Sequence, residues 1–205
     1  MNRARLLQLA TVLAALAAGS ATATRAQTPA SDSGARWVVD ILHSQIDFRV
    51  RHLLGRVRGT FTNWYAVLET RGPDWRQGTV TVTVQTASLN TGNPYRDADL
   101  RSNRFFAADV FPRMLFEGTG IVATDSTVEL TGILTIKGRS HPVTFRGQYR
   151  GVARDPEGHE RIAFEATAVV DRRDYGITWN EIVGGNSLIG NEVEIIIALE
   201  AVRVP

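Results

Sequence analysis

The sequence predicts an all-β domain, with about eight antiparallel strands, on three observations. Apolar and polar residues alternate with a period of two through most of the chain, as in strands with one buried face. Short segments rich in Gly, Pro, Asp and Ser separate the alternating runs. Only one stretch resembles a helix. Strands joined by such short links pair antiparallel with their neighbours.

The alternating runs follow one another from Ile46 to near the C-terminus. The first places Ile46, Phe48 and Val50 on one face, with Asp47 and Arg49 on the other. The remaining runs predict strands within residues 61–68, 80–84, 114–122, 128–136, 143–149, 162–170 and 193–199. The run at 128–136 keeps its phase except at Gly132.

The links between the runs carry turn-forming residues. The clearest predicted turns are residues 71–74, 124–126, 137–140 and 155–158. The one predicted helix spans residues 93–108, with Asn93 as N-cap, Pro94 at the first helical position and Leu100 on one face. A series of antiparallel strands can form a sandwich or a closed barrel, and periodicity does not choose between them.

The N-terminus has the pattern of a secretory signal peptide. Arg3 and Arg5 precede an uncharged run at residues 6–18, and small residues follow up to Ala23 and Ala26, the two candidate cleavage sites. The run is shorter than the roughly 20 residues that span a bilayer. We therefore expect residues 1–26 to be a cleaved signal peptide, and the protein to be periplasmic. Residues 27–36 are small and polar and predict a disordered lead-in, before one domain at residues 37–205.

Composition excludes several kinds of site. The chain has no Cys, which excludes disulfides, thiol nucleophiles and Cys-ligated metals. Its formal net charge is +2, and loss of the three arginines in residues 1–26, where there is no acid, leaves −1. This near-neutral balance, without a basic tract, argues against a nucleic-acid partner.

His43 and His52 are the first candidates for chemistry. His52 continues the phase of Ile46, Phe48 and Val50, so it either supplies a polar group to an apolar interior or is a hydrogen-bonded core histidine. Both histidines could bind one metal with Asp40 or Asp47 only if the chain turned between them, because nine strand residues span about 30 Å. We expect no metal and no cofactor.

Two further segments carry residues of types used in chemistry. Ser44 beside His43 allows a hydrolase hypothesis, but Ser44 lacks the Gly-x-Ser-x-Gly elbow, and adjacent residues on a strand point to opposite faces. Residues 171–176 concentrate charge after an apolar strand. They are either a solvated strand end, or a site where Arg172, oriented by Asp171 or Asp174, binds an acidic head group.

Many short motifs, in one order from Trp37 to Val202, carry a resemblance to a known family. They include Asp40-(x2)-His43-Ser44-(x3)-Phe48, Gly59-Thr60-Phe61, Asn90-Thr91-Gly92, Phe105-Phe106, Leu130-Thr131-Gly132, Asp171-Arg172-(x1)-Asp174-Tyr175-Gly176 and Gly190-Asn191-Glu192-Val193. The chain resembles the YceI family of lipocalin-like, polyisoprenoid-binding proteins. It departs from the family pattern at Ile41-Leu42, where Pro or another turn former commonly precedes His43.

The resemblance implies an extended eight-stranded antiparallel lipocalin-like barrel with one short helix, closed around a long apolar cavity. It implies a ligand of isoprenoid or fatty-acid type and no catalytic residues. The residues implied near the cavity mouth are His43, His52, Asp97, Asp171 and Arg172. Those implied to line the cavity are Phe48, Phe61, Leu100, Phe105, Phe106, Phe116, Leu134 and Ile136.

We therefore expect a non-enzymatic carrier that sequesters a long apolar lipid. Two alternatives stay open: an enzyme acting on an isoprenoid lipid through His43 or His52, and a stress-related structural module. The sequence also leaves open a transient membrane contact and homodimerisation.

Overall fold

The computed structural model describes residues 34–72 and 74–204. The predicted signal peptide and residues 27–33 of the predicted lead-in lie outside these ranges. The first strand begins at Arg36, and Ala35 is already buried, so the last residues of the predicted lead-in are part of the folded domain.

The structure is built almost entirely from strands. The strands are β1 Arg36–Val39, β2 Gln45–His52, β3 Gly55–Phe61, β4 Trp64–Thr70, β5 Gly78–Gln85, β6 Leu89–Asn90, β7 Arg113–Ala123, β8 Thr127–Ile136, β9 Arg139–Arg154, β10 Glu160–Asp171, β11 Ile182–Val183, β12 Asn186–Ser187 and β13 Ile189–Val204. The helix α1 spans Pro94–Arg101, and short 3₁₀ turns occupy Ile41–His43, Trp75–Gln77 and Thr86–Ser88.

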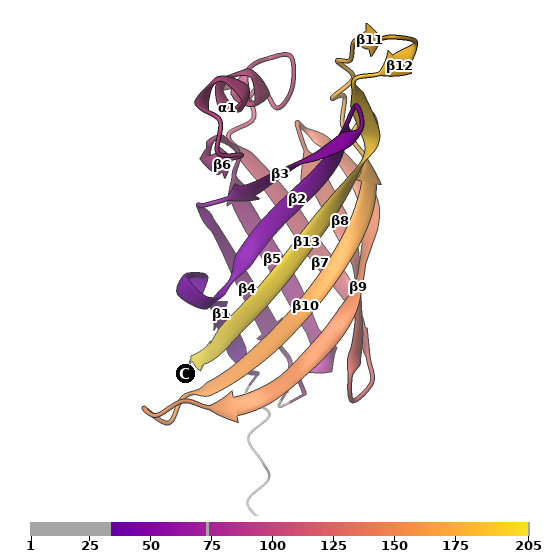
Figure 1. Ribbon diagram of the computed structural model, residues 1–205. Helices are drawn as coiled ribbons and strands as arrows, with labels where there is room; N and C mark the ends of the chain where they lie inside the picture. The colour runs from indigo at the N-terminus through magenta and orange to yellow at the C-terminus, as the bar shows by residue number, and fades with distance from the viewer. Residues whose placement is uncertain (1–33, 73, 205) are drawn as a thin grey trace, which may run out of the picture. The chain divides into compact units, whose positions relative to one another are not determined.

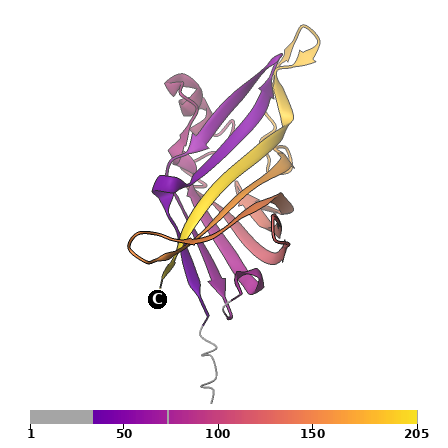
Figure 2. The same cartoon turned by 60° about the horizontal axis from the view of Figure 1, so that its bottom comes forward.

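The sheet closes on itself as a barrel, which confirms the predicted fold class. The order β1-β4-β5-β7-β8-β9-β10-β13 is completed by pairing of β13 with β1, which gives eight antiparallel strands in a ring (Figure 1 and Figure 2). The long strand β13 pairs with β1 at residues 201–204 and with β2 at residues 189–198. β1 and β2 thus form two successive parts of one side of the barrel.

The 3₁₀ turn at Ile41–His43 makes the bend between β1 and β2. The Asp40 side chain caps it by accepting a hydrogen bond from the Leu42 backbone N–H at 3.1 Å. An Asp cap satisfies a backbone donor at the start of such a turn, so the bend forms although Ile41-Leu42 stands where the resemblance leads one to expect Pro or another turn former. The same bend directs β2 and β3 toward the end of the barrel that carries α1 (Figure 1).

Large aromatic side chains fill the opposite end of the barrel. The Trp75 ring centroid lies 4.9 Å from that of Tyr149 and 4.9 Å from that of Phe164. Trp37 and Ile162 are buried in the same cluster. Close packing of these rings stabilises this end and closes it to a ligand.

Gly132, the one break in the phase of its strand, pairs with Gly118 on β7. A Cβ atom at Gly132 would lie 2.4 Å from the Glu117 carbonyl oxygen and 2.6 Å from the Phe116 ring. The missing side chain therefore leaves room for Phe116, which packs edge-on against Phe145 inside the barrel.

The helix is shorter than predicted, since α1 ends at Arg101 rather than near residue 108. Asn93 caps its start as expected, accepting hydrogen bonds from the Tyr95 and Arg96 N–H groups. Ser102 ends it with extended backbone, and turns then direct the buried Phe105 into the core. Within the described ranges, no helix combines the length and apolarity needed to cross a membrane.

Candidate ligand-binding cavity

A cavity of about 490 Å³ occupies the α1 end of the barrel. This volume is within the roughly 300–1,000 Å³ of typical small-molecule sites. Its walls are almost entirely apolar and come from β2, β3, β5, β7, β8, β9, β10 and β13, while residues of α1 and of the segment after β10 contribute at its mouth. The side chains of the aromatic cluster around Trp75 are not part of its lining.

Ten of the thirteen predicted site residues line this cavity. They are Phe48, His52, Phe61, Leu100, Phe105, Phe106, Phe116, Leu134, Ile136 and Arg172. Phe48, Phe61 and Phe106 form one aromatic group, with centroids 5.6 Å apart for Phe48 and Phe61 and 6.4 Å for Phe61 and Phe106. Residues on this wall alternate in and out as the period of two predicts.

His52 lies at the exposed end of the cavity, as the last residue of β2. Its neighbours on the same strand face, Val50 and Phe48, continue the lining inward. Arg96 and Asp99, from α1, are further polar residues of the lining. His52, Arg96 and Asp99 therefore place polar groups at the mouth.

Arg172 is the most buried charged residue of the lining, with 5% of its surface exposed. Its Nε donates to the Gly190 carbonyl at 2.9 Å, and its Nη1 donates to the carbonyls of Ile177 at 2.6 Å and Trp179 at 2.8 Å. Nη2 has only a 3.4 Å contact with Asn191 Oδ1, so this nitrogen keeps donor capacity. Burial lowers the pKa of the Arg172 guanidinium from its ordinary value.

Arg172 is oriented by carbonyl groups rather than by the acids that the sequence suggested. Asp171 pairs instead with Arg173, whose Nε lies 3.0 Å from Asp171 Oδ1. That hydrogen bonding lowers the pKa of Asp171 to about 2. Asp171 does not line the cavity, because its side chain extends to the outer side with the exposed Arg173.

Asp97 is buried in α1 but outside the cavity lining. Its Oδ1 accepts hydrogen bonds from the Thr91 backbone N–H at 3.0 Å and from the Thr91 hydroxyl at 2.5 Å. The Thr91 hydroxyl in turn accepts from Arg96 Nε at 2.8 Å. Asp97 therefore holds the segment that precedes the helix.

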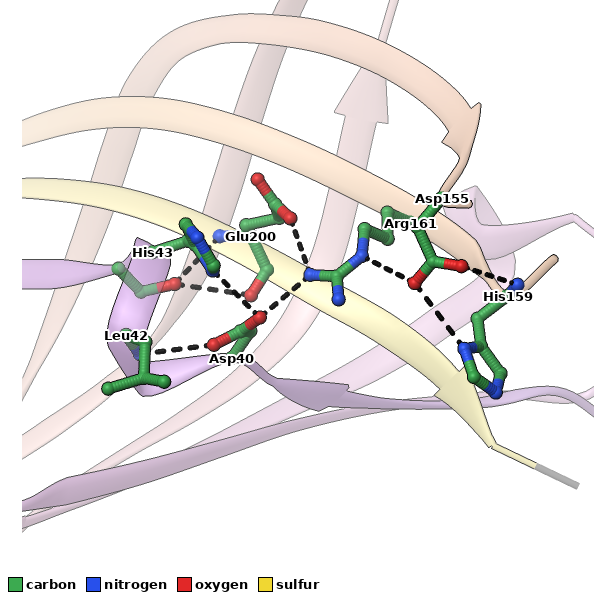
Figure 3. Close-up of polar contacts among 8 residues, drawn as sticks. Asp40, Leu42, His43, Asp155, His159, Arg161 and Glu200 are labelled. Carbon is green, nitrogen blue, oxygen red and sulfur yellow. Dashed lines mark hydrogen bonds and ion pairs between the residues drawn. The ribbon is translucent and has the colours of Figure 1, made fainter. Parts of the chain in front are cut away.

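His43 also lies outside the cavity, within a charged network on the outer surface (Figure 3). Its Nδ1 lies 2.9 Å from Asp40 Oδ2, and Arg161 Nη1 donates to Asp40 and to Glu200, both at 2.7 Å. Hydrogen bonds from Arg161 and His43 lower the pKa of Asp40 to about 2. Because the guanidinium lies between Asp40 and Glu200, a metal bound by Asp40, His43 and Glu200 would have to displace it.

The two histidines are too far apart to act on one group. His43 precedes β2 and His52 ends it, and the intervening strand of residues 45–52 rises about 23 Å. Ser44 is not hydrogen-bonded to either histidine: its hydroxyl donates to the Glu200 carbonyl at 3.1 Å and accepts from the Glu200 N–H at 2.8 Å. The hydroxyl therefore joins β13 to the bend between β1 and β2.

Several lining residues were not among the predicted site residues. Those on regular strands include Val50, Val57, Val82, Val84, Met114, Phe145, Val170, Val193, Ile195, Ile197 and Leu199. The alternation of their strands gave a usable signal for them. Tyr175, Ile177, Trp179 and Leu188 come from irregular segments, where no periodicity marks the inward face.

Comparison with known proteins agrees with this fold. The model of the YceI-like domain family matches residues 37–201. A UPF0312 protein of Pseudomonas paraeruginosa is 33% identical over 194 residues, which cover 93% of this chain and 97% of that protein.

Two solved structures share the architecture. The YCEI protein of Campylobacter jejuni is 28% identical with a TM-score of 0.65, over 76% of this chain and 90% of that one. A polyisoprenoid binding domain from Saccharophagus degradans has a TM-score of 0.64 at 12% identity, over 82% of this chain and 98% of that one. From the family match, the relative and the barrel topology, we conclude that this chain belongs to the YceI-like domain family.

Proposed function

We propose that this barrel binds one long apolar lipid chain, of isoprenoid or fatty-acid type, and carries it without altering it. The observation that carries the proposal is the 490 Å³ cavity, with apolar side chains from strands around the barrel and polar groups at one end. Such a cavity removes an apolar chain from water and leaves its head group at the mouth. The Saccharophagus degradans domain, described as polyisoprenoid binding, supports the isoprenoid class through the shared fold.

The energetics favour reversible loading. Burial of a methylene contributes about 0.8 kcal/mol, so a 40-carbon chain would nominally gain roughly 30 kcal/mol from water. This exceeds the practical affinity limit of about 18–21 kcal/mol. The relevant reference is a membrane, where the chain is already shielded from water. The net free energy of transfer is then small, which suits a carrier.

Arg172 and the α1 residues would select the head group. The apolar wall discriminates weakly between chains of similar length, whereas an unmatched polar group in a buried site is costly. Arg172 Nη2 retains donor capacity, and Arg96 and His52 lie on the same lining. We therefore expect a head group that accepts hydrogen bonds.

Export to the periplasm is part of the proposal. The basic, apolar and small-residue order of residues 1–26 supports it. A carrier there would move lipid through an aqueous compartment. N-terminal sequencing of the protein recovered from the periplasm tests this part, with a start at Thr24 or Gln27 expected and an intact Met1 contradicting it.

Binding is tested by a matched pair of substitutions on β10. Val170 lines the cavity, whereas the neighbouring Val169 is 62% exposed. Val170→Trp should reduce binding of a polyprenol at least tenfold by filling the cavity, and Val169→Trp should not. Ile197→Phe repeats the test from β13 in case Val170→Trp unfolds the barrel. Equal binding by all variants would refute a ligand site in the barrel.

Geometry does not favour the enzyme hypothesis. His43 is hydrogen-bonded to Asp40 on the outer surface, and the Ser44 hydroxyl is engaged by Glu200. We expect His43→Ala and His52→Ala to leave the chemical structure of a bound lipid unchanged. Conversion of the lipid by the parent protein, lost in either variant, would restore the enzyme hypothesis.

A further inference from the structure

The outer face of the β2–β3 hairpin carries four arginines in two directly opposed pairs. The strand register places Arg49 opposite Arg58 and Arg51 opposite Arg56. The inner face of the same hairpin carries Val50 and Val57 into the cavity lining, so the arginines point away from the cavity. Like charges placed directly across a strand pair are destabilising.

The arginines of this hairpin have fewer acidic partners than arginines on β9. On β9, Arg146 lies 2.8 Å from Glu129 and Arg150 lies 2.6 Å from Glu165, so each arginine faces an acid. On the hairpin, only Arg49 has a carboxylate within 4 Å among the described residues, at 3.7 Å from Glu194. The hairpin therefore has a local excess of positive charge.

Apolar side chains are exposed at the tip of this hairpin and on β11 of the adjoining β11–β12 hairpin. Leu54, in the β2–β3 turn, is fully exposed, and Ile182 is 68% exposed. The Leu53 N–H donates to the Leu188 carbonyl at 2.8 Å, which joins the two hairpins. Both lie at the α1 end of the barrel (Figure 1), and His52 and Leu188 beside them line the cavity.

We propose that these two hairpins dock on an anionic phospholipid surface and direct the cavity mouth toward it. Phosphate oxygens accept hydrogen bonds from the four arginines and remove the repulsion within each pair. Leu54 and Ile182 enter the interfacial region of the bilayer. This inference deepens the proposed carrier function, because a lipid chain would then pass between membrane and cavity without crossing water.

Protection of a sheet edge is the competing explanation. Between Gly55 and Gly59, β3 has no second partner strand among the described residues, and charged side chains commonly prevent edge-to-edge association. That explanation covers Arg56 and Arg58. It does not account for Arg49 and Arg51 on β2, which is paired on both sides, nor for exposed Leu54 at the tip.

Co-sedimentation with vesicles of phosphatidylglycerol and phosphatidylethanolamine, against vesicles of phosphatidylcholine, tests the proposal. Each arginine near an anionic surface is worth about fivefold in partitioning. The double substitution Arg56→Glu with Arg58→Glu should therefore reduce binding to the anionic vesicles at least about 25-fold. Because it places acids opposite Arg51 and Arg49, it should leave the free energy of unfolding unchanged or raise it.

The matched control is Arg146→Glu with Arg150→Glu, which makes the same change in net charge on β9 and should affect vesicle binding much less. Leu54→Asp should also weaken binding, whereas Val152→Asp, at an exposed position on β9, should not. Full binding by the hairpin double variant, or an equal loss in the β9 control, would overturn the proposal.

The lipid content of each variant distinguishes this proposal from the carrier function. Arg56 and Arg58 are not part of the cavity lining, so the hairpin variant should keep any bound lipid while losing vesicle binding. If the parent protein binds anionic vesicles but has no lipid in its cavity, the docking proposal stands and the proposed carrier function is contradicted.

Discussion

Arg172 Nη1 donates a hydrogen bond to the carbonyl of Trp179 at 2.8 Å, which ties a buried guanidinium to a segment that lines the cavity mouth. The same guanidinium binds the carbonyls of Gly190 and Ile177. One side chain thus joins the start of β13 to the irregular chain after β10. The cavity mouth depends on this connection.

Arg172→Met should lower the free energy of unfolding by about 3 kcal/mol, because several buried carbonyls lose their donors. It should also weaken lipid binding, since Trp179 loses its anchor. Urea unfolding and polyprenol binding measure the two effects. The exposed neighbour gives the control: Arg173→Met should change the free energy of unfolding by less than about 1 kcal/mol. Equal effects of the two substitutions would contradict the assigned role.

Tyr175→Phe should raise the free energy of unfolding by about 1 kcal/mol, because the buried Tyr175 hydroxyl has no hydrogen-bond partner in the described part of the chain. Burial also raises the pKa of this hydroxyl to about 12. The edge-on contact with His141, at 5.1 Å between ring centroids, needs only the ring.

Thermal unfolding of Tyr175→Phe beside Tyr65→Phe, which alters an exposed tyrosine, checks this prediction. A marked loss of stability in the Tyr175 variant would mean that the hydroxyl has a partner. A gain in stability combined with weaker lipid binding would mean that the hydroxyl binds the ligand and has no partner in the protein.

Asp40→Asn should lower the free energy of unfolding at pH 7 by about 1 kcal/mol, because Arg161 loses a charged partner. Asp40 has its pKa lowered from 3.8 to about 2, so its contribution is present above pH 3.8 and is lost as the pH falls toward 2. The difference between parent and variant should therefore shrink over this interval. Urea titrations at pH 7, 4 and 2 measure it, and a constant difference would contradict the assignment.

Trp75→Ala should lower the free energy of unfolding by about 3–5 kcal/mol, because it removes a buried ring from the closed end of the barrel. Its contacts with Tyr149 and Phe164 lie outside the cavity. Lipid affinity of the folded variant should stay close to that of the parent. Tyr65→Ala, at an exposed position, serves as control, and a similarly small loss in both variants would contradict the role of the cluster.

Alternation along the chain predicted β2, β5, β7, β8, β9, β10 and β13. It missed β1 and β3, and the strand predicted at residues 61–68 spans the turn between β3 and β4. The phase of Ile46, Phe48 and Val50 continues to His52 in the cavity lining, as predicted, but His52 is exposed at the mouth and is not a buried core histidine. Periodicity left the choice between barrel and sandwich open because it is a local property. Closure depends on the pairing of β13 with β1, two segments at opposite ends of the domain.

The polar residues were harder to predict, because hydrogen-bond partners distant in sequence decide where they lie. His43 and Asp97 bind local groups outside the cavity, and Asp171 pairs with Arg173 rather than Arg172. Trp179 lies in an irregular segment, so no period marks it as lining. The opposed arginines of the hairpin become evident only with the register of β2 and β3.

Mass spectrometry of an organic extract of the protein, purified under mild conditions from its native host, tests the lipid-binding role most directly. We expect one dominant long-chain lipid class at close to one molecule per barrel, present in Val169→Trp and depleted in Val170→Trp. Protein that is consistently empty, or lipid held equally by both variants, would contradict it.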